Sequence, residues 1–154
     1  MSAGDRLRAT LTEVPIAPAD PILIVVDAAN PSGPSGLRGG ESLTLRDGGT
    51  LGDNFAAVEA AMIVEGGSIG RGAEVAGGTV LLTGGIVGDG FAAHSGSVVT
   101  VDGANLGSQF SATPGSVVNL LGGEIGSGAS AIGNTVVNVD GGTLGRGFQA
   151  FSGS

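Results

Sequence analysis

The chain of 154 residues contains no cysteine, tryptophan, tyrosine or lysine, and six arginines face 14 acidic residues, for a net charge of −8. The missing cysteines exclude disulfides and thiolate metal sites. The shortage of cations argues against nucleic acid or an anionic membrane as a partner, because both require clustered positive charge. The longest apolar run, residues 22–26, is far too short to span a bilayer.

A secretory signal is also not recognisable, because residues 1–14 lack the apolar segment that such signals contain. These absences leave the localisation unknown. They also leave few residue types with which a site could be built.

Glycine, in contrast, occurs 32 times, and much of it belongs to one motif that recurs six times. The copies read GGTLGDNF, GGSIGRGA, GGIVGDGF, GANLGSQF, GGEIGSGA and GGTLGRGF, beginning at Gly48, Gly66, Gly84, Gly103, Gly122 and Gly141. The start positions advance by 18, 18, 19, 19 and 19 in turn. A nearly fixed period of this length predicts a solenoid, in which each repeat buries its apolar side chains by stacking on the next.

Each repeat contains three short apolar stretches separated by glycine-rich corners, which predicts three strands per coil. Frequent glycine disfavours helix, at about 1 kcal/mol for each glycine in a helix interior. One aliphatic residue per copy is expected inside, at Leu51, Ile69, Val87, Leu106, Ile125 and Leu144. Four positions later, a second inward row is expected at Phe55, Ala73, Phe91, Phe110, Ala129 and Phe148.

The predicted fold is therefore all-β, a single-stranded parallel β-helix (β-solenoid) of about six coils, each of roughly 18–19 residues. A left-handed helix of hexapeptides is the alternative, but the phenylalanines and the lengthening of the period along the chain favour the right-handed form. Residues 1–40 hold five of the six prolines and lack the repeat, so they are expected to form an N-terminal cap or adaptor with one strand. Residues 41–154 are expected to form the β-helix.

The pattern V-x-[IVL]-x-G-G-x-[LI]-G-x-x-F-x-A-x-x-G-S over residues 41–154 resembles the repeats of pectin-lyase-like parallel β-helix proteins. It is most similar to Gly-rich arrays of bacterial surface proteins, and a likeness to bactofilins is limited to the overall plan. The resemblance implies a right-handed β-helix and favours an extracellular surface or a virion. It carries over no catalytic residues, because the basic and calcium-binding clusters of the family's enzymes have no counterpart here.

Three groups of residues are candidate sites, and each is better explained by structure. Asp53 and Asp89 follow Gly-Gly-x-x-Gly in a way that invites comparison with calcium-binding nonapeptides, but the other copies do not have Asp there. His94 is the only histidine, and its spacing implies no partner. A row of acids next to the Gly-Gly corners is typical of solvated turns, although paired carboxylates also serve glycoside hydrolysis; its members are Asp47, Glu65, Asp102 and Asp140.

We therefore assign no catalytic, metal-binding or cofactor-binding residue and expect no cofactor. An outward apolar ladder is expected at Leu81, Val98, Val117 and Val136, as an interface or as a surface covered by residues 22–26. The last coil is expected to present a bare core layer with Phe148, unless Phe151 folds over it.

These features predict a non-enzymatic structural, self-assembling β-solenoid, as a filament or a surface or virion scaffold, with a homo-oligomer as the expected partner. The alternative is a catalytic or non-catalytic part of a polysaccharide-binding or lyase-type β-helix, such as a tailspike, with a polysaccharide as partner. The lack of Tyr and Trp, which binding faces usually present, favours the first.

Overall fold

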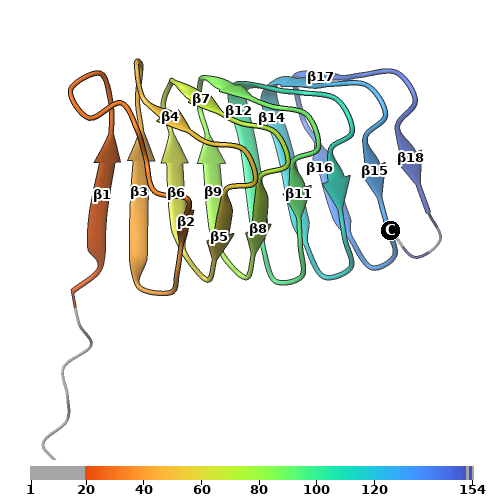
Figure 1. Cartoon of the computed structure of the whole chain (residues 1–154). Coiled ribbons are helices and arrows are strands. Elements are labelled where there is room, and N and C mark those ends of the chain that lie inside the picture. Colours follow the sequence, from red (N-terminus) through yellow and green to blue (C-terminus); the bar gives the residue numbers. More distant parts are fainter. Residues whose placement is uncertain (1–19, 152, 154) are drawn as a thin grey trace, which may run out of the picture.

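The computed structural model describes residues 20–151 and 153, and these residues contain strands and turns but no helix. The strands are all parallel to their neighbours and stack as a solenoid of seven coils (Figure 1). We number the coils one to seven, with residues 20–40, 41–60, 61–78, 79–97, 98–116, 117–135 and 136–151. The predicted all-β parallel solenoid is therefore confirmed. Because no helix is present in these residues, none could cross a membrane.

Three faces run along the rod, and each takes one strand or half-strand from a coil. Face one consists of β1 (Ile22–Val26), β3 (Glu41–Leu45), β6 (Ala61–Val64), β9 (Thr79–Leu82), the first halves of β12 (Val98–Leu106) and β14 (Val117–Ile125), and β16 (Val136–Val139). Face two consists of β4 (Thr50–Leu51), β7 (Ser68–Ile69), β10 (Ile86–Val87), the second halves of β12 and β14, and β17 (Thr143–Leu144). Face three consists of β2 (Gly36–Leu37), β5 (Ala56–Val58), β8 (Glu74–Ala76), β11 (Ala92–Ala93), β13 (Ser111–Ala112), β15 (Ser130–Ala131) and β18 (Gln149–Ala150).

The coils are in a register that follows the sequence period. On face one, for example, Val98 pairs with Val117 and Val117 pairs with Val136, so each residue meets the one that is a single period away. Faces one and two join into a single 11-stranded sheet, because β12 and β14 continue through the corner between them. With coils about 4.8 Å apart, seven coils make a rod roughly 34 Å long.

The core is a set of rows in which like residues of successive coils stack. The motif aliphatics from Leu51 to Ile125 are buried as predicted, and Leu144 in coil seven is only partly buried. The Phe/Ala row is also inside, and the rings of Phe91 and Phe110 stack with centroids 5.8 Å apart.

Coil three compensates for a small residue in that Phe/Ala row. It has Ala73 where coils two and four have phenylalanine, and it carries Val75 where those coils have alanine. The larger neighbour keeps the cross-section filled, as close packing of protein interiors requires.

Glycine after the motif aliphatic in coils three to seven is explained by the close approach of successive coils. A Cβ on Gly126 would lie 2.7 Å from the carbonyl carbon of Gly107 in the preceding coil. The Gly-Gly corner has a second requirement, because Gly85 adopts a φ of 84°, which disfavours any residue with a side chain. Both observations explain why glycine recurs with the period of the coil.

Residues 20–40 form coil one of the same solenoid, in which β1 pairs with β3 and β2 pairs with β5. The sequence predicts one strand in residues 1–40, and the structure adds a second, β2. The difference arises because Leu37 of β2 is buried against the next coil. Residues 22–26 therefore extend face one and do not cover its outward side. The part of the predicted cap that precedes residue 20 lies outside the described residues.

Candidate functional site

The aspartates that resemble calcium ligands bind backbone amides of the following coil. Asp53 Oδ1 accepts a hydrogen bond of 2.8 Å from the Arg71 amide, and Asp89 Oδ1 accepts one of 2.8 Å from the Ser108 amide. Calcium requires six to eight oxygen ligands, and no cluster of three or more metal-binding side chains occurs within the described residues. These two aspartates thus tie one corner to the next.

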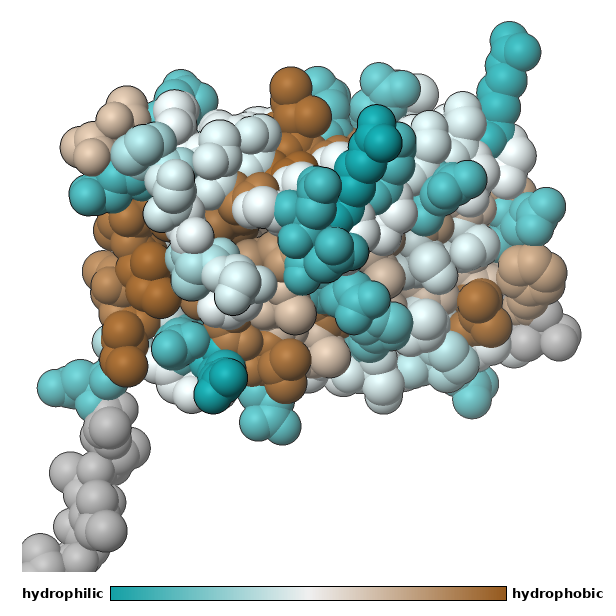
Figure 2. All heavy atoms as spheres, in the orientation of Figure 1, coloured by the Kyte–Doolittle hydropathy of each residue, from teal (hydrophilic) through white to brown (hydrophobic). Residues whose placement is uncertain are grey.

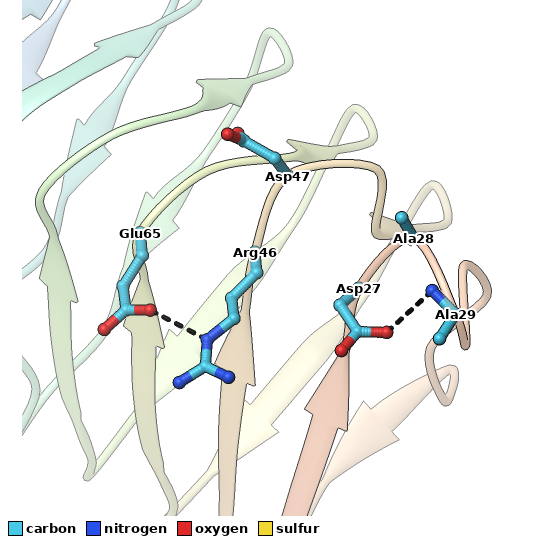
Figure 3. Close-up of a pocket in the computed structure, with 6 residues that line it drawn as sticks. All are labelled: Asp27, Ala28, Ala29, Arg46, Asp47 and Glu65. Carbon is cyan, nitrogen blue, oxygen red and sulfur yellow. Dashed lines mark hydrogen bonds and ion pairs between the residues drawn. The ribbon is translucent and has the colours of Figure 1, made fainter.

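A hollow of about 550 Å³ lies at the corner that follows face one in coils one to three. Figure 3 shows its lining, in which Arg46 points toward Glu65 while Asp47 points away from both. Arg46 Nε and Glu65 Oε2 are 2.9 Å apart, and both side chains are about half exposed. Asp27 uses Oδ1 to accept bonds from the amides of Ala29 and Asn30, which closes its own turn. Two of the three carboxylates are therefore engaged in structural contacts.

The predicted row of acids is interrupted in the structure. Extension of the strand pairing by one residue places Asp27, Arg46, Glu65, Thr83 and Asp102 in one row. A register shift then pairs Asp102 with Gly122 instead of Leu121, and Asp140 follows β16 in coil seven. Glu65, Asp102 and Asp140 are thus two coils apart, or roughly 9.6 Å by coil spacing. Asp47 lies one residue beyond this row. Glu65, Asp102 and Asp140 therefore form no close pair of the kind that a retaining glycosidase uses at about 5–5.5 Å, and Asp47 points away from Glu65 (Figure 3).

His94 has two neighbours that its local sequence does not reveal. Its Nε2 lies 3.8 Å from Glu74 Oε2, and its Nδ1 lies 3.5 Å from Thr113 Oγ1. The three residues come from coils three, four and five on face three. Thr113 is one period beyond His94, so the period itself was the signal that could have found this contact. The contacts are long, and no described cavity is lined by His94, so the trio forms no visible substrate site.

The outward side of face one consists of two rows. The first contains Leu23, Ser42, Ala61, Thr79, Val98, Val117 and Val136, and the second contains Val25, Thr44, Ile63, Leu81, Thr100, Asn119 and Asn138. The prediction that Leu81 shares a ladder with the three valines was wrong, because Leu81 pairs with Thr100. The step from Gly84 to Gly103 already implied that pairing. All four residues nevertheless face outward, as predicted.

None of these 14 outward positions carries an ionisable side chain. The other two faces do, since strand β14 places Glu124 on face two and face three presents Glu74 and His94. A hollow of about 420 Å³ lies on face one, between coils three and five, and is lined by Ala61, Met62, Ile63, Thr79, Val80, Leu81, Val98 and Thr100. Towards coil seven the second row is polar: Asn138 Nδ2 donates to Asn119 Oδ1 at 2.8 Å, and Asn119 Nδ2 donates to Thr100 Oγ1 at 3.4 Å.

Coil seven is not covered by any other described coil on its outer side. Among the described residues from Val136 to Phe151, none is buried, although their equivalents in coil six include Leu120 and Ile125. Phe148 is partly buried and lines a hollow of about 160 Å³ at this end. Phe151 is the equivalent of Ile132 one coil further on, at an outward position of face three. It is exposed, so it does not close the end as a plug.

Comparison of the chain with family models, with curated proteins and with solved structures gives no match.

Proposed function

We propose that this chain is a non-enzymatic structural protein that self-assembles through the uncovered end of its solenoid. The observation that carries the proposal is the exposure of inward-pointing residues in coil seven. Val139 continues the core row of Leu120, yet its side chain is 53% exposed, whereas that of Leu120 is 0% exposed. A core layer of this kind is stabilised when another apolar layer covers it.

The backbone at this end supports the same proposal. Strand β16 pairs only with β14, β17 pairs only with β14, and β18 pairs only with β15 among the described residues. Each strand thus presents an open edge, and open edges favour pairing with another chain. β16 supplies four residues of edge, while β17 and β18 supply two each.

We assign the covering layer to coil seven of a second copy. At the other end of the rod, the centre of coil one is closed, because Val26 and Leu37 are buried there. An equally open layer is therefore presented by the same end of another copy. Such an isologous contact closes as a dimer, and antiparallel pairing of the two β16 strands sets its two-fold axis normal to face one.

The use of polar groups supports a role without catalysis. The motif aspartates bind backbone amides, Arg46 pairs with Glu65, and asparagines pair along face one. The resemblance of the repeat to Gly-rich arrays of bacterial surface proteins is in keeping with a scaffold at a cell surface or on a virion.

The test is the mass of the chain in solution across a tenfold dilution, measured by sedimentation. We expect the wild type to reach at least twice its 14.7 kDa at high concentration, and Val139→Lys to lose the end-to-end dimer. Val58→Lys is the matched control, because Val58 is 49% exposed on face three, away from this end; it should behave as the wild type does.

A wild type that stays monomeric at every concentration contradicts self-assembly. Unlimited filaments in electron micrographs contradict the closed dimer. Specific binding of a polysaccharide by the monomer would instead favour the alternative function.

A further inference from the structure

We infer that face one is a second interface, which packs against face one of another copy with the two rods side by side and parallel. The inference rests on the proposed function in one respect, namely that the chain associates with itself. Its surface is the pair of outward rows defined above, and its centre is the hollow between coils three and five.

Charge limits which faces of two copies can meet. Each chain carries a net charge of −8, so two copies repel one another over distances of about a Debye length, roughly 8 Å in physiological salt. Charged groups that become buried without a partner would add a large desolvation penalty. Face one avoids both costs locally, because none of its 14 outward positions is ionisable. A highly charged partner would therefore find no oppositely charged side chain among these outward positions.

Side-chain volumes along the two rows make the face complementary to itself. In coils three and four the two outward residues are one small and one large, Ala61 with Ile63 and Thr79 with Leu81, and in coil five Val98 and Thr100 have similar volumes. A two-fold axis along the strands would make the rods antiparallel and place each row over itself. A two-fold axis along the rods keeps them parallel and places the first row of one copy over the second row of the other. In coils three and four each large residue then meets a small one, which is the interdigitation that packed sheets require.

The polar part of the second row marks where the apolar part of this interface ends. Asn119 and Asn138 already hydrogen-bond along the row, so their amides are partly satisfied without a partner chain. Ile63, Leu81 and Val98 are therefore the apolar centre of the interface. Figure 2 shows another side of the rod, where isolated hydrophobic residues are interspersed with hydrophilic ones and the hydrophobic groups gather mainly at the end where β1 lies.

Area predicts that the two interfaces reinforce each other. Face one measures roughly 30 Å by 13 Å from coil and residue spacings, or about 400 Å² per copy. A standard interface buries about 800 Å² per partner. The end-to-end dimer proposed above places two faces in line and doubles the area, so lateral pairing should be weak between monomers and stronger between dimers.

Cysteine cross-linking tests this geometry, because the natural chain has no cysteine. In the proposed register Val98 of one copy faces Thr100 of the other. Mild oxidation of an equal mixture of Val98→Cys and Thr100→Cys chains should therefore give mixed dimers in several-fold excess over either self-linked product. The pair Ala92→Cys and His94→Cys has the same spacing on face three and should give no such excess.

The mixture is also oxidised in the Val139→Lys background, which removes the end contact. Mixed cross-links that persist there, at lower yield, support the lateral interface whether or not the end dimer forms. Mixed products at only the statistical half of the total overturn the proposed register. Cross-linking no greater than in the face-three pair overturns the interface itself.

A second measurement does not depend on cysteine. Ile63→Lys places a charge on face one at a residue that is 41% exposed. We expect the mass of this variant, measured by light scattering at high concentration, to be lower than that of the wild type. Val58→Lys again serves as the matched control. Equal masses for the two variants would contradict the inference.

Discussion

Coil one and coil seven have strands of the same kind, but their core residues are covered to very different extents. In coil one, Val26 and Leu37 are 2% and 1% exposed although no further described coil stacks on their outer side. In coil seven, the residues equivalent to these, Val139 and Ala150, are exposed. The difference lies in the connections between strands.

The connection of coil one runs along the edge of β4, where Ser32 forms a parallel bridge with Thr50. Its turn is held by Asp27, the Gly33 amide donates to the Thr50 carbonyl oxygen at 2.9 Å, and the Thr50 amide donates to the Pro31 carbonyl oxygen at 2.7 Å. A Cβ on Gly33 would lie 2.2 Å from Leu51 Cδ2, so this backbone rests directly on the core. Coil seven keeps the ordinary motif corners, which run around its perimeter. The comparison teaches that burial of the end layer depends on how the connection between its strands packs, as well as on the composition of those strands.

The largest effect on stability is expected when a charge is placed in the buried core, and the same charge in the partly buried last coil should cost much less. Ile125→Asp should unfold the chain, because an unpaired carboxylate in the core costs several kcal/mol, on the order of the whole stability of a domain. Leu144→Asp, in the same row of the partly buried last coil, should cost only about 1 kcal/mol. Urea unfolding followed by circular dichroism measures both. Equal losses would show that coil seven is as well covered as coil six.

A smaller effect is expected from a methyl group added between coils. Gly126→Ala places Cβ against the backbone of coil five and should cost about 1–3 kcal/mol, as overpacking does. Gly52→Ala is the matched control in the same motif position: its Cβ meets nothing within 4 Å, because the connection of coil one does not pass there. The melting temperature should fall for Gly126→Ala and stay unchanged or rise slightly for Gly52→Ala. A fall of similar size in both would refute this view of coil one.

The smallest effect concerns the closing turn itself. Asp27→Ala removes the two side-chain hydrogen bonds of 2.9 and 3.0 Å to Ala29 and Asn30 and should cost about 1 kcal/mol. Hydrogen exchange at the amides of Gly33 and Thr50 should accelerate. Asp140→Ala changes the same row in coil seven and should leave both stability and exchange at those amides as in the wild type. Unchanged exchange in Asp27→Ala would show that the turn closes the end without this carboxylate.

Much of the fold could be predicted because side-chain size repeats with the coil. The glycine after each aliphatic and the rows of Leu51 and Phe55 are visible in the sequence, and they define the inward side of every coil. The error at Leu81 arose because alternation along one strand shows which side a residue faces, but does not show which residue of the next strand it pairs with. Pairing between strands follows the period, which was already present in the step between Gly84 and Gly103.

The candidate sites were less predictable, because their geometry depends on contacts between coils. Glu74 and Thr113 become neighbours of His94 through stacking, and Arg46 meets Glu65 in the same way. Asp53 and Asp89 resemble metal ligands in sequence, but the amide that each one binds belongs to the following coil. Such partners lie a whole coil away along the chain and cannot be read from a local motif.

The sequence by itself determined the repeating coil, its three short strands and its inward rows, because these follow from local side-chain volume and from glycine's tolerance of close backbone contact. Only the tertiary structure decided that residues 20–40 stack as a first coil, that their connection closes one end, and that the other end leaves its core exposed. These features depend on where a non-repeating connection packs against the core. No period encodes that path, since it is selected by the free energy of covering one particular layer.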